Sequence, residues 1–189
     1  MPTEKAHGIQ IMKMCQAFAA GGADVELLVP RRWNDLKQDS FDFYNIKKTF
    51  KIVRIPCLDF VSFDIANIGF FISATSFLIF TKIYLFFKKY DVLYSREQLT
   101  GIFFRNSILE VHALPQGIGY FRKYLLNRAK EVVVLTSFLK NILTKSGIAA
   151  NKILVLPDAV DMEEFDIDIS KEAAREKLEL PLDKKIILY

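Results

Sequence analysis

Short apolar runs alternate along this chain with stretches whose apolar residues recur at every third or fourth position. In residues 8–20, Ile11, Cys15 and Phe18 fall on one stripe, which predicts an amphipathic helix closed by Gly21-Gly22. Further helices are predicted at residues 97–104, at 120–129, from an N-cap at Ser137 to residue 146 with Gly147 as the stop, and from an N-cap at Ser170 to residue 178.

Strands are predicted at residues 25–29, 50–55, 92–95, 108–111, 132–135, 153–156 and 186–188. Their apolar runs are nearly unbroken, which is typical of strands buried on both faces. Because such strands alternate with helices, we expect a doubly wound parallel sheet of the Rossmann-like α/β class.

The start of the chain departs from the usual plan of such a domain. Rossmann-like domains normally open on a strand, whereas residues 1–7 are predicted to form a loop that leads directly into the first helix. The first strand is usually central, so its absence predicts a gap between its two neighbours and an uncovered helix face. We interpret the chain as one whose first strand is missing through truncation.

Residues 65–81 carry no charge and are rich in Phe. A membrane-spanning helix needs about 20 apolar residues, and this run is shorter, is diluted by small polar residues and continues through Lys82 into a charged end at Lys88-Lys89. We interpret it as a long helix packed against the sheet, with insertion into a membrane interface as the alternative.

Composition narrows the class only slightly. The 189 residues include 26 Lys and Arg against 22 Asp and Glu, a net charge of +4 that permits contact with an anionic membrane or a phosphate but does not argue for nucleic acid. Cys15 and Cys57 have no metal-ligand spacing, and the N-terminus lacks an apolar signal segment. These features favour reduced thiols and a cytoplasmic location, with peripheral contact at the inner membrane face left open.

Ligands of open parallel sheets bind beyond the carboxyl ends of the strands. That rule nominates Pro30-Arg31-Arg32, Arg96-Glu97, His112, Thr136-Ser137 and Asp158. The His112 imidazole can hydrogen-bond a bound hydroxyl or carbonyl, although a structural histidine bonded to backbone is an equal alternative. Arg96 can pair with phosphate or a carboxylate, and an ion pair to Glu97 or Asp91 is its alternative.

The segment His7-Gly8 is a weaker candidate, just before the predicted first helix. A glycine there would let a ligand approach free backbone N–H groups. The sequence contains no GxGxxG, P-loop or GxSxG motif and no metal-binding cluster.

Five segments, taken in order, carry a resemblance to a known family. They are Lys5-Ala6-His7-Gly8-Ile9-Gln10-Ile11-Met12-Lys13-Met14; Tyr90-Asp91-Val92-Leu93-Tyr94-Ser95-Arg96; Leu109-Glu110-Val111-His112; Val133-Val134-Leu135-Thr136-Ser137; and Val155-Leu156-Pro157-Asp158-Ala159-Val160-Asp161 with Phe165. Together they resemble the N-terminal domain of the GT-B-fold glycosyltransferases, specifically the group-1 (family 4) retaining class. The match spans almost the whole chain.

The resemblance implies a nucleotide-sugar donor, a hydroxyl acceptor that is a lipid, a polysaccharide or a small molecule, and no metal or other cofactor. It places His7-Gly8 on the acceptor side of a cleft, His112 beside the donor sugar as the catalytic residue, and Thr136-Ser137 along the same cleft. Asp158-Ala159 departs from the Asn-Gly usual in the family.

Residues 1–165 would then form the acceptor-side domain, and residues 166–189 the connection and first strand of a donor-binding domain. In the family that second domain holds the diphosphate, so we expect residues 1–189 alone to be inactive. Two other hypotheses remain: a non-catalytic Rossmann-like binding or interaction module that lacks a donor site, and a membrane-associated protein built around the Phe-rich helix.

Overall fold

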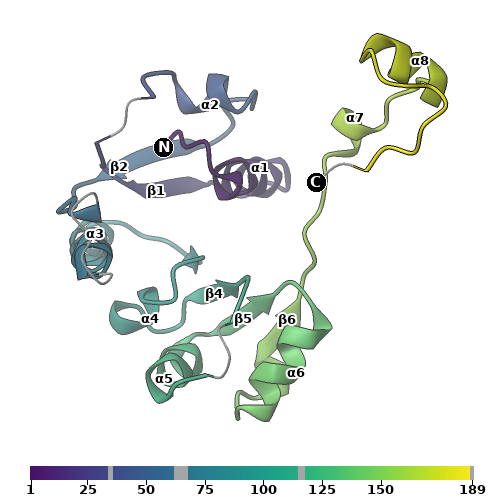
Figure 1. The fold of residues 1–189 in the computed structure, drawn as a ribbon. Helices are drawn as coiled ribbons and strands as arrows, with labels where there is room; N and C mark the ends of the chain where they lie inside the picture. Colours follow the sequence, from purple (N-terminus) through teal and green to yellow (C-terminus); the bar gives the residue numbers. More distant parts are fainter. Residues whose placement is uncertain (34–35, 62–67, 115–117, 188–189) are drawn as a thin grey trace. The chain divides into compact units, whose positions relative to one another are not determined.

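The computed structural model describes residues 1–33, 36–61, 68–114 and 118–187 and falls into two compact units, Met1–Leu156 and Pro157–Tyr189. The break between the two units follows Leu156, and the domain boundary predicted after residue 165 stays a prediction. In the first unit, helices alternate with parallel strands (Figure 1). The predicted Rossmann-like, doubly wound α/β class is therefore confirmed.

The first unit contains, in chain order, α1 (Ala6–Ala20), β1 (Glu26–Pro30), α2 (Ser40–Phe43), β2 (Lys51–Ile55), α3 (Ile68–Phe86), β3 (Tyr94–Ser95), α4 (Thr100–Phe103), β4 (Ile108–Val111), α5 (Tyr120–Arg128), β5 (Glu131–Val134), α6 (Ser137–Lys145), the 3₁₀ turn η2 (Ala150–Lys152) and β6 (Ile153–Val155). Most lie close to their predicted bounds, but β3 and α4 are shorter. The four-residue helix α2 was missed, because one turn is too short to show a helical period.

The start of α6 corrects one prediction. Ser137 is the first helical residue, and the N-cap is Thr136, whose hydroxyl accepts a hydrogen bond from the Leu139 N–H at 3.2 Å. Thr136 has extended backbone angles, as an N-cap residue requires. The predicted stop at Gly147 is confirmed by its φ of 87°, a conformation that glycine adopts without strain.

The strands form two separate parallel sheets, β1-β2 and β3-β4-β5-β6. Within the described ranges no ladder joins β1 to β3, so the expected gap between these neighbours is confirmed. The Arg31 N–H donates to the Ile55 carbonyl of β2 at 2.7 Å. Because N–H groups alternate in direction along a strand, the Leu28 N–H points away from β2, toward the unpaired edge of β1.

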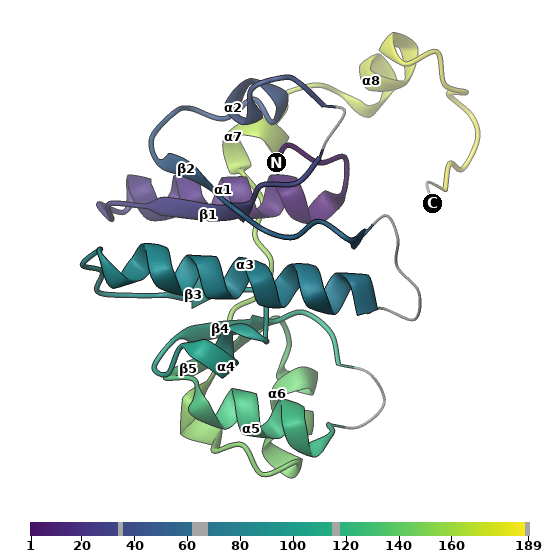
Figure 2. The same cartoon turned by 90° about the vertical axis from the view of Figure 1, so that its left-hand side faces the viewer.

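Helix α3 joins the two sheets through side chains. Its buried Leu78 and Leu85 form a cluster with Phe104, against which Leu28 of β1 and Leu93 before β3 pack. Figure 2 shows α3 across the near side of the unit, between the β1-β2 pair and the larger sheet. The predicted packed helix is confirmed for residues 68–86, while residues 65–67 of that prediction lie outside the described ranges.

Helix α1 also reaches across the gap. The rings of Phe18 in α1 and Tyr94 in β3 lie 5.7 Å apart in an edge-to-face arrangement. The same helix buries Met12 and Cys15 in a second cluster with Phe41, Tyr44, Ile46 and Phe50. The two sheets are thus held to one another by helix side chains instead of by backbone hydrogen bonds.

The largest core lies in the four-stranded sheet. Leu109, Val111, Val132 and Val134 are fully buried there and pack against residues of α5 and α6, including Leu126 and Leu143. These strands match the unbroken apolar runs of the sequence.

The second unit contains α7 (Met162–Phe165) and α8 (Lys171–Lys177). The predicted cap of α8 is confirmed, because the Ser170 hydroxyl accepts from the Ala173 N–H at 3.1 Å. The predicted strand at residues 186–188 is wrong for Ile186 and Ile187, which are in no strand, and its last residue lies outside the described ranges. A lone strand forms no ladder, and the described part of this unit holds no other strand for it to pair with.

Candidate functional site

Four polar side chains gather on one face of the four-stranded sheet, at the carboxyl ends of β3 and β4. The register pairs Tyr94 with Ile108 and Ser95 with Leu109, so residue 96 comes opposite residue 110. Because side chains alternate between faces, Tyr94 and Arg96 share a face with Glu110 and His112. This group is called the Glu110 cluster below.

Glu110 is the centre of the cluster and its side chain is only 2% exposed. Its Oε2 accepts a hydrogen bond from the Tyr94 hydroxyl at 2.6 Å. Its Oε1 contacts His112 Nε2 and lies 3.8 Å from Arg96 Nε. A buried carboxylate is stable only when paired and hydrogen-bonded, and these three partners meet that requirement.

The contacts fix the protonation pattern of His112. Arg96 Nη2 lies 3.1 Å from His112 Nδ1, and a guanidinium can only donate, so Nδ1 is the acceptor. Nε2 is therefore the donor of this ring, directed at Glu110. Both ring nitrogens are engaged by side chains, so a ligand hydroxyl reaches His112 only by replacing Arg96 or Glu110.

In the described part of the chain, Arg96 has a nitrogen whose N–H donors lack an acceptor. Its Nη1 is buried and has no hydrogen-bond partner among the described residues. A buried guanidinium N–H without an acceptor is costly, and an oxygen atom of a ligand would remove that cost. Neither predicted alternative, a pair with Glu97 or with Asp91, accounts for Arg96, whose recorded ion pair is with Glu110.

Tyr94 serves the cluster as a neutral donor. Burial, with the hydrogen bond to Glu110 and its charge, raises the pKa of the Tyr94 hydroxyl well above its usual value. The phenol therefore keeps its proton over the whole physiological range and holds the Glu110 carboxylate in place.

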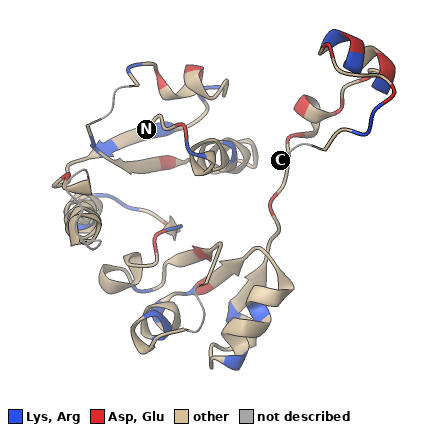
Figure 3. Cartoon of the chain, in the orientation of Figure 1, with Lys and Arg blue, Asp and Glu red and all other residues tan. Residues whose placement is uncertain are grey.

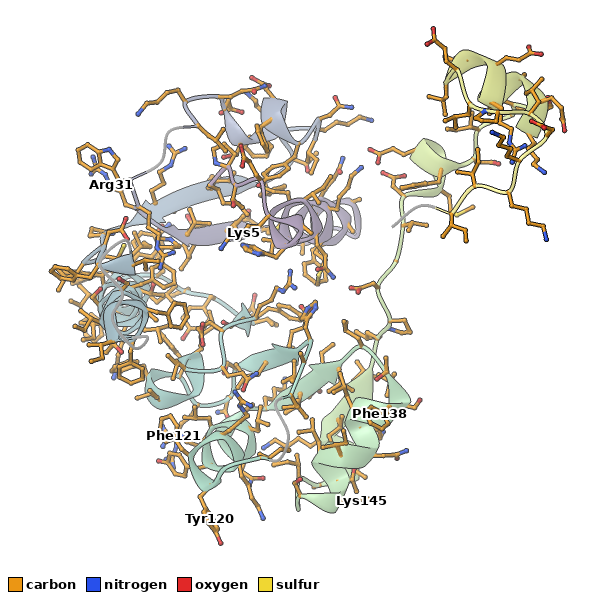
Figure 4. The ribbon with its side chains drawn as sticks, viewed as in Figure 1. Lys5, Arg31, Tyr120, Phe121, Phe138 and Lys145 are labelled. Atoms are coloured by element: carbon orange, nitrogen blue, oxygen red, sulfur yellow. The ribbon has the colours of Figure 1, made fainter. Side chains whose placement is uncertain are left out.

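His7 lies near this cluster. Its pKa is lowered by desolvation and then by the positive charges of Arg96 and Lys5, which places the exposed His7 ring within electrostatic reach of Arg96. Figure 4 labels Lys5 beside α1, where the chain enters the helix. The tertiary structure thus brings Arg96 to His112 and places His7 where the charge of Arg96 is felt, while the role of His7 in a site stays a prediction.

Gly8 has a different environment from the expected one. It belongs to the first turn of α1, and its N–H donates to the Lys5 carbonyl at 2.8 Å, so the predicted free N–H is wrong. A Cβ on Gly8 would lie 2.1 Å from Tyr44 Oη. Close packing therefore explains this glycine, and its place in an acceptor site stays a prediction.

The other nominated residues of the first unit make no hydrogen bond or ion pair with the cluster among the contacts of the described residues. Thr136 and Ser137 are exposed at the start of α6, beyond the carboxyl end of β5, and in the described ranges neither has a recorded hydrogen bond to His112. Arg32 pairs loosely with Asp59 at 3.9 Å. Asp158 belongs to the second unit.

Sequence reasoning did not single out Glu110 or Tyr94. The available signal was a carboxylate inside the otherwise apolar strand at residues 108–111, two positions before the histidine. Two residues apart on a strand means the same face, so the pair Glu110 and His112 could have been proposed from sequence. The contribution of Tyr94 depends on the strand register and could not.

The described ranges contain no group of three or more His, Cys, Asp or Glu side chains placed to hold a metal ion. Cys15 and Cys57 are both free, as expected, and burial raises the pKa of the Cys15 thiol to about 11. The chemistry that the cluster offers is hydrogen bonding by a guanidinium, an imidazole and a carboxylate that orients them.

Comparison with known proteins adds no assignment: no protein-family model matches the chain, and no curated protein matches it.

Proposed function

We propose that this chain is the acceptor-side half of a retaining, nucleotide-sugar-dependent glycosyltransferase that transfers a sugar to a hydroxyl acceptor. The Glu110 cluster supports the proposal, because it lies at the carboxyl ends of parallel strands, where ligands of such sheets bind. The ordered motifs that resemble the family 4 enzymes supply the reaction type, and the cluster supplies groups suited to sugar hydroxyls.

Each member of the cluster has a role in the proposal. Arg96 Nη1 donates to an oxygen of the bound sugar, which supplies the acceptor that this buried N–H lacks. A sugar hydroxyl takes the place of Arg96 Nη2 at His112 Nδ1 and is oriented by it, while Glu110 keeps Nε2 and so sets the tautomer and the angle of the imidazole. His7 borders the acceptor side, where its neutral ring can accept a hydrogen bond.

The departing nucleoside diphosphate needs positive charge to stabilise it. In the proposal this charge does not come from residues 1–189. A donor-binding domain provides it, and the donor phosphate takes the acceptor proton, so the proposal requires no dedicated base here. We expect purified residues 1–189 to show no turnover, and turnover by that material would contradict the proposal.

The test begins with the coding DNA on both sides of this reading frame. A downstream domain with a glycine-rich turn and a Glu-x7-Glu carboxylate pair would support the proposal. The longest encoded protein is then assayed for release of nucleoside diphosphate from a panel of nucleotide sugars. His112→Ala should lower turnover about 10²–10³-fold, the loss typical of one deleted transition-state donor.

Lys145→Ala, at the exposed end of α6, is the matched control and should leave turnover unchanged. Stop codons on both sides of the reading frame, together with no turnover of any nucleotide sugar, would contradict the proposed enzyme. The hypothesis of a non-catalytic binding module would then remain.

A further inference from the structure

Helix α3 has apolar residues on all its faces, yet the folded unit covers only part of them. Helices of this composition are normally buried in a protein core or in a membrane. By length and composition α3 could cross a bilayer, but only 39% of its most apolar window is buried. The largest uncovered part is one stripe, called the α3 outer face: Ile68, Phe71, Ile72, Ile79, Ile83 and Phe86. Phe70 and Phe80 are exposed away from it.

The opposite face is fixed to the domain. Ser73 Oγ accepts from the Phe60 N–H at 3.0 Å, and Ser76 Oγ accepts from the Leu58 N–H at 2.9 Å. Leu78 is buried at 2% exposure in the cluster that joins the two sheets. Spanning a bilayer would break these contacts, so the helix stays on the domain and presents its outer face sideways.

The apolar surface continues beyond the helix. Leu58 and Phe60, held beside α3 by those hydrogen bonds, are exposed, and Phe87 after the helix is 80% exposed. An open groove of about 350 Å³ runs along the C-terminal half of α3, between Ile83, Phe86 and Phe103, and its lining is almost wholly apolar. A contiguous apolar surface of this size usually marks a site that binds another protein or a membrane.

Charge indicates the occupant. The described residues of α3 include no Asp or Glu, and Lys82 is the only charged side chain on the helix. Lys88 and Lys89 follow at its end, although Lys88 also pairs with Glu26 at 3.3 Å. Figure 3 shows α3 in tan, in contrast to the mixed charges of α8. Glu26 beside Lys88 and Asp59 between Leu58 and Phe60 are acidic side chains nearby, and each is paired with a basic residue, so an apolar helix that carries only lysine charge complements an anionic lipid surface.

We infer that the α3 outer face docks on an anionic bilayer, with α3 lying flat in the headgroup region. A 19-residue helix is about 28 Å long, and laid flat it offers its whole stripe to the lipid. Phe86 and Phe87 enter the acyl boundary, and Lys82 and Lys89 contact headgroup phosphates. The inference goes beyond the proposed function and does not depend on it.

The test is co-sedimentation of purified residues 1–189 with vesicles of phosphatidylcholine alone or mixed with phosphatidylserine. We expect binding to the mixed vesicles and its release by high salt. Phe86→Gln with Phe87→Gln should weaken that binding about tenfold or more, since each change removes a buried aromatic ring. Lys82→Gln and Lys89→Gln should each cost about fivefold at low salt.

The matched control is Tyr120→Gln with Phe121→Gln, an aromatic pair exposed on α5 (Figure 4). It should bind like the unchanged protein, and circular dichroism confirms that each variant is folded. Absence of binding to the mixed vesicles would overturn the inference, as would an equal loss in the control pair. A different result would assign the face to a second copy of the chain: the protein forms dimers in solution, the Phe86→Gln, Phe87→Gln variant is monomeric, and neither binds vesicles.

Discussion

Glu110→Ala gives the sharpest test of the buried cluster. The substitution leaves the Tyr94 hydroxyl, His112 Nε2 and Arg96 without the carboxylate that engages them. Breaking a buried ion pair by removing one partner typically costs about 3–5 kcal/mol. Tyr94→Phe removes one charge-assisted bond of 2.6 Å, for which about 1.5–3 kcal/mol is expected.

The assay is equilibrium unfolding in urea, followed by far-ultraviolet circular dichroism. Glu110→Gln keeps the shape and one acceptor for Tyr94, so its loss should fall below that of Glu110→Ala. Glu131→Ala, at the start of β5, is a half-buried carboxylate control that should change the free energy of unfolding by less than about 1 kcal/mol. A loss below about 1 kcal/mol for Glu110→Ala would refute the reasoning, because it would mean that the carboxylate is not buried among these partners.

Three further outcomes are expected. Gly8→Ala should lower the free energy of unfolding by about 1–3 kcal/mol, because its Cβ meets the Tyr44 hydroxyl, and combined with Tyr44→Phe it should cost less than the sum of the two single losses. By NMR titration, His7 should have a pKa below 6.5, and Arg96→Gln should raise it. Since the folded state then binds fewer protons than the unfolded state, the contribution of His7 destabilises the fold as pH falls below about 6.5. In hydrogen exchange, the Leu28 amide should exchange much faster than the interior amides of β5, because it faces an unpaired edge.

Each of these outcomes has a contrary result. Additive losses for Gly8 and Tyr44 would mean that the two residues do not touch. A His7 pKa at or above 6.5 would mean that the ring is neither desolvated nor close to the charge of Arg96. Strong protection at Leu28 would mean that β1 pairs with a further strand.

Periodicity alone was enough for the long elements. The stripe through Ile11, Cys15 and Phe18 predicted α1, although the helix buries Met12 with Cys15 and leaves Phe18 exposed. The solid run at residues 132–135 predicted β5, because a segment with such a run needs burial whichever neighbour covers it. The pattern failed for α2, which spans one turn, and for the strand predicted at residues 186–188, which depends on a neighbouring strand. For α6 the pattern predicted the helix but gave Ser137 as its N-cap instead of Thr136. Both residue types are good N-caps, and the position of the cap depends on where β5 ends.

The sequence by itself determined the alternation of helices and parallel strands, the polar residues at the strand ends and the uncharged length of α3. Tertiary structure decided which of those residues meet. The register of β3 on β4 brings Arg96 opposite Glu110, and the fold holds one face of α3 against both sheets while the other stays bare. The physical reason is that burial and periodicity are properties of one segment, whereas pairing, register and exposure depend on what a second segment supplies.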